Sequence, residues 1–317
     1  FVEGGVQGNM KRSLQVFVCF IAFLLLPLSA AWAAEIAPCW RLDAPAEMGL
    51  PRSFRTSGDA FSGGEMVTRE GLDWLRMSGS GQPSEVGLSA LYEHIRELTM
   101  APVYLVDLRQ ESHGFVGGNG VSWYSQHNLA NRGKRAAEIE RIEKEQLAAM
   151  VNQPMEAVPL GQEDTASFVS VQTVVKHPTT EREAAVRLGF RYVRIAAPDQ
   201  MWPDAPVVDD FMDFYKSLPA EPVWLHFHCQ AGHGRTTVFM VLYDLLRNPQ
   251  LPLEAIVARQ TALGGSNLLA PVTGEGRTAE LNRDRSAKLR LFYQYVQENS
   301  AAGYPVKWSD WLKKQAE

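Results

Sequence analysis

Short, strongly apolar runs alternate with amphipathic stretches along most of this chain. Val103–Leu108, Phe190–Ala197 and the run that begins at Val223 are apolar enough to be buried strands, whereas Glu85–Thr99 repeats its apolar residues at helical spacing. Strands that alternate with helices in this way favour a parallel sheet covered by helices. The pattern therefore predicts an α/β fold with a twisted, mainly parallel sheet flanked by helices.

The remaining elements follow from the same periodicity. Strands are also expected at 71–80 and 167–176, the second within a possible small β excursion, and residues 34–65 are expected to be irregular. Thr180 and Glu183 have the spacing of a capping box, which predicts a helix start. Further helices are expected at 131–150, 179–188, 207–218, 235–247, 253–262, 289–298 and 308–314, and residues 277–290 form a charged run.

A leader is expected before the folded domain. Met10-Lys11-Arg12 precedes an apolar run from Leu14 to about Leu28, and Ala31-Trp32-Ala33 has the small residues of a cleavage site. The run is short for a membrane-spanning helix, which needs about 20 residues. We expect upstream residues and a signal peptide at 1–33, one domain at 34–317, and a secreted or periplasmic product without a stable membrane anchor.

Charge and cysteine content narrow the possible partners. The formal net charge of −5 argues against binding of nucleic acid by bulk attraction, so a polyanionic ligand would need a local basic pocket. Cys39 is expected to lie in a mobile N-terminal tail, away from Cys229. No Walker motif, dinucleotide fingerprint or zinc-ligand spacing is present, and neither a cofactor nor a metal is expected.

The strongest chemical signal is the Cys229–Arg235 loop, which separates an apolar run from a helix. A loop of this length can direct successive backbone N–H groups at one point and form an anion nest. Gly232 and Gly234 allow the crowded or positive-φ backbone that such a loop needs. The N-terminus of the following helix favours an anion at the same point, and Arg235 can bind two phosphate oxygens. A thiol placed there readily forms the nucleophilic thiolate.

The residues from His228 to Thr236 resemble the signature loop of the cysteine-dependent, tyrosine-phosphatase-like phosphatases. Further segments resemble one branch of that superfamily, the bacterial phosphatase-like phytases or inositol polyphosphate phosphatases. These segments are 54–57, 106–114, 121–124, 194–197 with 202–203, and 295–299. The resemblance runs from about residue 50 to the C-terminus. It implies a metal-independent hydrolase that releases phosphate from myo-inositol polyphosphates (phytate) through a cysteinyl-phosphate; the alternative is a tyrosine or dual-specificity phosphatase acting on phosphoproteins.

A general acid must protonate the leaving alkoxide, and two carboxylates compete for that role. Asp204 stands in a literal Trp-Pro-Asp, the form found in tyrosine phosphatases. Asp199 follows Arg-Ile-Ala-Ala-Pro, where the phytase-like branch carries its acid. The wider resemblance favours Asp199, which leaves Asp204 as a cap for the following helix.

The resemblance also implies roles for residues around the loop. Thr236 is expected to hydrogen-bond the Cys229 sulfur and His228 to brace the loop, while His113 is expected to make structural hydrogen bonds. The stretch after residue 276 departs from the family pattern, because Asn282 or a neighbour stands where a tyrosine is usual. The phosphate-binding loop would comprise Gln230, Ala231, Gly232, His233, Gly234 and Arg235, and the substrate contacts Arg55, Gln200, Arg277, Arg283 and Arg285.

Overall fold

A computed structural model describes residues 37–63, 67–162 and 167–315 of the chain. The predicted signal peptide at 1–33 lies outside the described residues. None of the helices that the structure describes is long and apolar enough to cross a membrane.

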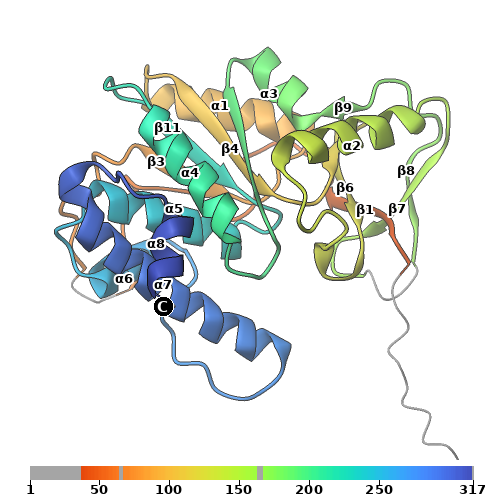
Figure 1. Cartoon of the computed structure of the whole chain (residues 1–317). Coiled ribbons are helices and arrows are strands. Elements are labelled where there is room, and N and C mark those ends of the chain that lie inside the picture. The colour runs from red at the N-terminus through yellow and green to blue at the C-terminus, as the bar shows by residue number, and fades with distance from the viewer. Residues whose placement is uncertain (1–36, 64–66, 163–166, 316–317) are drawn as a thin grey trace, which may run out of the picture. The chain divides into compact units, whose positions relative to one another are not determined.

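The centre of the fold is a five-stranded sheet in the order β10-β4-β11-β3-β2 (Figure 1). Adjacent strands are parallel except for β2, which is antiparallel to β3. Arg194 of β10 and His228 of β11 both lie beside Asp107 of β4 in the strand pairing. Polar side chains therefore form a row near the carboxyl ends of these strands. The strands are β10 (Arg191–Ala197), β4 (Val103–Arg109), β11 (Trp224–His228), β3 (Met77–Ser80) and β2 (Arg55–Thr56).

Helices cover both faces of this sheet, as the periodicity predicted. On one face, α1 (Glu85–Leu98) and α3 (Glu181–Leu188) pack their apolar residues against β4 and β10. The other face is covered by a larger helical layer built around α5, which is buried along most of its length. That layer comprises α4 (Ala205–Ser217), α5 (Gly234–Arg247), α6 (Leu253–Ala262), α7 (Arg277–Asn299) and α8 (Trp308–Gln315).

Local sequence signals explain several helix ends. The Ser84 hydroxyl accepts a hydrogen bond from the Gly87 amide at the start of α1. Thr180 and Glu183 form the predicted capping box of α3, and Gly189 ends that helix with φ 105°. The predicted start of α3 is therefore confirmed.

A second sheet, in the order β8-β7-β1-β6-β5-β9, packs against α2 (Ala136–Ala149) (Figure 1). It is antiparallel except where β1 pairs with β7. Leu147 of α2 and Trp40, Val121 and Met155 of the sheet share one apolar cluster. The strands are β8 (Val169–Gln172), β7 (Met155–Pro159), β1 (Cys39–Ala44), β6 (Asn119–Tyr124), β5 (His113–Val116) and β9 (Thr179–Thr180).

Several expectations about this region were wrong. Cys39 begins β1 instead of lying in a mobile tail, and the stretch expected to be irregular at 34–65 contains both β1 and β2. Of the strand expected at 71–80, only β3 is extended. Leu72 and Leu75 lie in a turn that buries both side chains and leaves Trp74 76% exposed. The charged run at 277–290 is the first half of α7. Two short 3-10 helices, η1 (Gln126–Asn128) and η2 (Ser300–Ala302), complete the fold.

Candidate active site

The Cys229–Arg235 loop joins the central strand of the parallel sheet to the most deeply buried helix. β11 ends at His228 and α5 begins at Gly234, so the loop lies at the carboxyl edge of the sheet, where α/β proteins place their sites. Gly232 has φ 82°, and a Cβ at this position would lie 2.5 Å from the amide nitrogen of Gly81. The positive φ and the close approach both require glycine here.

Groups outside the loop bind two of its carbonyl oxygens. Arg55 Nη1 donates to the Gly232 oxygen over 2.7 Å, and the Gln82 amide donates to the Gln230 oxygen over 3.0 Å. The Arg52 guanidinium donates to the Gln230 oxygen as well. In a trans peptide unit the N–H group points opposite to the C=O group, so the amides of these units point away from the outer donors. That orientation suits an anion nest.

Arg55 lies behind the loop, which corrects the expectation that it contacts substrate. Its side chain is 2% exposed, and its Nη2 donates to Thr237 Oγ1 over 3.1 Å. Burial lowers the pKa of Arg55 to about 10, while the charge of Cys229 acts in the opposite direction. Arg55 therefore braces the loop from β2.

The other loop residues lie nearer the surface. Gln230 and Ala231 are half-buried and His233 is exposed, with its Nε2 3.0 Å from Ser53 Oγ. Partial burial, together with the neighbouring charges of Arg55 and Arg52, lowers the pKa of His233. The His233 ring is therefore neutral at pH 7.

Cys229 is buried at the base of the loop, with 3% of its surface exposed. Its Sγ accepts hydrogen bonds from the Thr236 hydroxyl over 3.1 Å and from the Gly232 amide over 3.3 Å. The Thr236 hydroxyl also lies 3.3 Å from the backbone oxygen of Ser80. Two donors that converge on sulfur suit the thiolate form of the side chain.

Arg235 is held by a carboxylate at the end of β4. Its Nη1 and Nη2 donate to the two Glu111 oxygens over 2.7 and 2.9 Å, and Nη1 also lies 3.3 Å from the Ala197 oxygen. Burial acts to raise the pKa of Glu111, but the charges of Arg235 and Arg109 outweigh it and hold that pKa well below its usual range. Arg235 is charged in turn, because Asp199 and Glu111 outweigh the effect of its own burial and raise its pKa.

Asp199 is the carboxylate that the structure brings to the loop. It follows β10, and its Oδ1 lies 3.0 Å from Arg235 Nη2. The Gln200 amide donates to the same oxygen over 3.1 Å, and Asn128 Nδ2 donates to Oδ2 over 2.8 Å. Asp204 instead occupies the N-cap position of α4, where it is exposed and its side chain makes no capping hydrogen bond. Its position matches the expected cap, but the expected hydrogen bond is not made.

Comparison with known proteins agrees with this geometry. A model of the protein-tyrosine-phosphatase-like (PTP-like) phytases, described as "Inositol hexakisphosphate", matches residues 106–247. The structure of the tandemly repeated PTP-like phytase from Mitsuokella multacida is similar, with a TM-score of 0.83 and 36% identity over 89% of this chain. A PTP-like phytase from Bdellovibrio bacteriovorus has a TM-score of 0.70 and 28% identity, covering 88% of this chain and 96% of its own.

The chain is therefore similar to the PTP-like phytases in sequence and in fold. It spans 50% of the Mitsuokella chain. It is also 26% identical over 289 residues to effector protein hopD2 of Pseudomonas syringae pv. tomato. That match covers 86% of this chain and 58% of hopD2. The chain therefore corresponds in length to about half of these two relatives.

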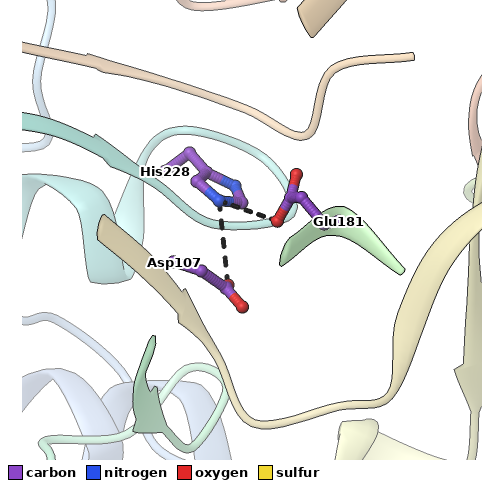
Figure 2. Close-up of side chains that lie close together, drawn as sticks. All are labelled: Asp107, Glu181 and His228. Atoms are coloured by element: carbon purple, nitrogen blue, oxygen red, sulfur yellow. Dashed lines mark ion pairs between the residues drawn. The ribbon is translucent and has the colours of Figure 1, made fainter. Parts of the chain in front are cut away.

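Next to the Cys229–Arg235 loop lies a buried group formed by His228, Asp107 and Glu181 (Figure 2). His228 Nε2 is 3.0 Å from Glu181 Oε2 and 3.8 Å from Asp107 Oδ1. The ligand atoms of these three residues lie within 4.8 Å of one another, a spacing at which a metal ion fits. The nearby Arg194 cation, 3.2 Å from Asp107, opposes a second positive charge.

Protein donors already engage both carboxylates of this group. The Tyr192 hydroxyl donates to Asp107 over 2.6 Å, and Gln82 Nε2 donates to Glu181 over 2.8 Å. His113 Nε2 lies 3.0 Å from the second Glu181 oxygen. Protein donors therefore satisfy the Asp107 and Glu181 carboxylates, whereas neither His228 ring nitrogen has a hydrogen-bond partner among the described residues. His113 makes the structural hydrogen bonds expected of it.

A cavity of about 530 Å³ lies between α7 and the segment that precedes it. Arg285 lines both this cavity and a smaller one of about 150 Å³ that also contains Gln200. Arg285 Nη2 donates to the Gln200 backbone oxygen over 3.0 Å. Arg277 and Arg283 line neither cavity, and Arg283 instead donates to the Gly274 oxygen. Of the substrate contacts expected on α7, the structure brings only Arg285 towards Asp199.

Three residues of the site were assigned no role in it from the sequence. Glu111 was visible two residues after a strand end, within a segment that resembles the family, yet its pairing with Arg235 had no sequence signal. Arg52 lies only three residues from Arg55, and nothing in the pattern distinguished their roles. Asn128 is 71 residues from Asp199, with which it bonds, and belongs to no motif.

Proposed function

We propose that this protein is a phosphomonoesterase that hydrolyses myo-inositol polyphosphates through a cysteinyl-phosphate intermediate. The observation that supports this best is the convergence of a buried cysteine, a buried arginine and a carboxylate on one loop. Cys229 lies under the loop amides, and Arg235 is 3.0 Å from Asp199. These are the groups that a nucleophilic displacement at phosphorus needs: a nucleophile, a cation for the phosphoryl oxygens and a proton donor.

In the first step the Cys229 thiolate attacks phosphorus. The S–P bond forms as the bond from phosphorus to the ester oxygen breaks, and protonated Asp199 gives its proton to the departing alkoxide. Arg235 and the loop amides bind the remaining phosphoryl oxygens, where charge develops. The alcohol leaves and a cysteinyl-phosphate remains.

In the second step Asp199 acts as a base. It removes a proton from water, the oxygen attacks phosphorus, and the S–P bond breaks to release inorganic phosphate. The thiolate leaves with its electron pair, stabilised by the Thr236 hydroxyl that donates to Sγ. Neither step requires a metal, so EDTA should leave turnover unchanged.

The substrate class is supported by the family and by the cavity beside Asp199. A Mitsuokella multacida PTP-like myo-inositol phosphatase was solved in complex with myo-inositol-(1,3,4,5)-tetrakisphosphate; it is 36% identical over 87% of this chain, with a TM-score of 0.82, and the match covers 49% of its own length. In this chain, Arg285 lines the adjacent cavity beside the polar side chains of Thr278 and Asn282. These groups suit a ring that carries hydroxyl and phosphate substituents.

The covalent step is tested with Cys229→Ser. Hydroxyl attack without a base is slow, so turnover should fall below detection. Binding of tungstate should survive, because the loop amides and Arg235 remain. Isothermal titration with tungstate and phosphate release from inositol hexakisphosphate provide the two measurements. Hydrolysis by the serine variant at a substantial fraction of the wild-type rate would refute the covalent route.

The substrate is tested by comparing inositol phosphates, phosphotyrosine peptides and a small aryl phosphate. Arg285→Glu should raise KM for the inositol substrate more than for the aryl phosphate, since clustered phosphates meet Arg285 in the cavity. Arg283→Glu, outside both cavities, is the matched control. A phosphopeptide preferred tenfold or more in kcat/KM, or equal effects of Arg285→Glu on both small substrates, would favour a phosphoprotein phosphatase.

We also propose that the protein is exported and loses the segment that ends at Ala33. The basis is the charged start, apolar run and small-residue site of that segment. The intact mass of the exported protein should correspond to a chain that begins at or near Ala34. Retention of the full-length chain in the membrane fraction would contradict the proposal.

A further inference from the structure

Most of the N–H donors of Arg235 are already occupied. A guanidinium has five N–H groups. Nη1 faces Glu111 Oε2 and the Ala197 oxygen, while Nη2 faces Glu111 Oε1 and Asp199 Oδ1. In the part of the chain that the structure describes, Nε has no hydrogen-bond partner, although the side chain is 96% buried. Nε is thus the donor that remains for a ligand.

A bidentate grip on phosphate needs a second donor beside Nε. Glu111 occupies the end of the guanidinium, where Nη1 and Nη2 lie side by side. The side formed by Nε and Nη2 remains, and there Asp199 Oδ1 forms an ion pair with Nη2 over 3.0 Å. A phosphate that binds this side through two parallel hydrogen bonds must displace Asp199 from Arg235. The general acid then loses its charged partner at the moment when it must face the leaving group.

We propose that Asn128 is the positioning residue that holds Asp199 once phosphate has taken over Arg235. This inference rests on the proposed function, in which Asp199 is the general acid. Asn128 Nδ2 donates to Asp199 Oδ2 over 2.8 Å, on the oxygen that Arg235 does not contact. Phosphate binding leaves that bond intact. Oδ1 loses its ion pair with Arg235, and this oxygen carries the proton that passes to the leaving alkoxide.

The backbone that presents Asn128 is strained, and neighbouring contacts stabilise it. His127 and Asn128 have φ of 59° and 58°, two consecutive non-glycine residues in the left-handed region. Residues in this region are strained, and they gather at functional sites. The backbone amide of Asn128 donates to the Ser125 backbone oxygen over 2.8 Å. Asn131 Nδ2 donates to the Gln110 backbone oxygen over 3.1 Å and to Ser112 Oγ over 3.0 Å.

These contacts fix the turn to the end of β4, beside the Glu111 that holds Arg235. Asn128 is 4% exposed, so protein contacts and not solvent set the orientation of its side-chain amide. The turn and the segment after β4 together hold Asp199 and Arg235 in a fixed relative position. Asparagine tolerates the left-handed backbone better than other residues with a side-chain donor.

Asn128→Gly tests the inference, because glycine accepts the left-handed backbone and lacks the amide. Inositol phosphate has a poor alkoxide leaving group that needs the proton, whereas para-nitrophenyl phosphate has a good one. We expect kcat/KM for the inositol phosphate, which reports the step that expels the leaving group, to fall about 10–100-fold, since small misplacements of a catalytic group cost up to about 10². The kcat/KM for para-nitrophenyl phosphate, which likewise reports only steps up to release of the leaving group, should change less than threefold.

Asn128→Asp is the second variant, isosteric with asparagine but lacking the N–H donor. It should show the same dependence on leaving group, and thermal melts should show both variants folded. Because Asn128 acts through Asp199, the double variant Asn128→Gly/Asp199→Asn should be no slower on inositol phosphate than Asp199→Asn alone. Additive losses, or equal losses on both substrates in both variants, would overturn the positioning role.

Asp199→Asn measured in parallel separates this inference from the proposed function. If Asp199→Asn shows no dependence on leaving group, Asp199 is not the general acid and the proposed mechanism fails. If Asp199→Asn shows that dependence and neither Asn128 variant does, only the role of Asn128 is overturned.

Discussion

Single side chains in this site take their chemical state from partners far away in the sequence. Arg235 is ionised and buried because Glu111, 124 residues away, meets it with both oxygens. Removing one member of a buried ion pair typically costs about 3–5 kcal/mol, because the other charge is left uncompensated. The Arg235 guanidinium is therefore held in place by the protein itself.

The two carboxylates that follow β10 should differ sharply in their effect on rate. Asp199→Asn should lower kcat on inositol hexakisphosphate by about 10²–10⁴, the range expected for loss of a positioned general acid. Asp204→Asn should change kcat little, because Asp204 is exposed and its side chain makes no capping hydrogen bond. Steady-state phosphate release measures both, and a larger loss for Asp204→Asn would contradict the assignment.

At the scale of elements, the strand–loop–helix unit from β11 to α5 supplies the frame of the site. β3 runs parallel to β11, so the chain that leaves β3 at Gly81 presses against the loop. Arg55 on β2 binds the loop from behind. The conformation of the loop therefore depends on neighbouring elements as well as on its own glycines.

Two glycines of the loop should respond oppositely to alanine. Gly232→Ala should lower the free energy of unfolding by at least about 1–3 kcal/mol, the cost of a non-glycine residue at positive φ, with a clash against Gly81 in addition. Gly234→Ala is the matched control: no protein atom lies within 4 Å of its Cβ position, and alanine favours the first turn of α5. Urea unfolding of both variants tests this, and equal losses would contradict it.

At the scale of the whole molecule, buried charges join the loop to the second sheet. Glu111 binds Arg109 as well as Arg235, and Arg109 Nη1 lies 2.8 Å from Asp43 on β1. Asp43 in turn pairs with Arg41. Burial acts to raise the pKa of Asp43, but Arg109 and Arg41 outweigh it and lower that pKa to about 2. The second sheet thus supports the candidate active site electrostatically.

His113 should make stability depend on pH. Burial acts to lower its pKa, but the charges of Asp107 and Glu143 and a hydrogen bond to Glu181 outweigh burial and the opposing Arg109, so the pKa is raised. When the pKa is higher in the folded protein than in the unfolded chain, protonation stabilises the fold. This stabilisation is fully present below the pKa of the unfolded chain, about 6.5, and is lost as the pH rises through the pKa of the folded protein. His113→Gln should therefore destabilise most near pH 6 and progressively less at higher pH.

Urea unfolding of both proteins from pH 5.5 to 8.5 measures this effect. The difference should shrink by up to about 1.4 kcal/mol per pH unit over the titration of one proton. His94→Gln on α1, where the histidine side chain is 36% exposed, is the surface control measured in parallel. A destabilisation by His113→Gln that stayed constant or grew with pH would argue against a charged His113.

The sequence by itself determined the α/β class and most helix positions, because apolar periodicity and local caps are properties of short segments. The capping box of Thr180 and Glu183 needs only four consecutive residues, and the Cys229–Arg235 loop carries its glycines and arginine within seven. The second sheet was underestimated because β1 pairs with β6 and β7, about 80 and 117 residues later in the chain by their register. Short strands of this kind leave little periodicity to detect.

Only the tertiary structure decided which charged residues work together. The sequence marks Arg55, Arg283 and Arg285 as candidate cations but cannot say which of them face the loop, the solvent or the cavity. Local composition likewise could not link Asn128 to Asp199 or Glu111 to Arg235. Buried polar groups must find partners wherever the folded chain brings them, so these pairings arise from the packing of the two sheets and not from spacing along the sequence.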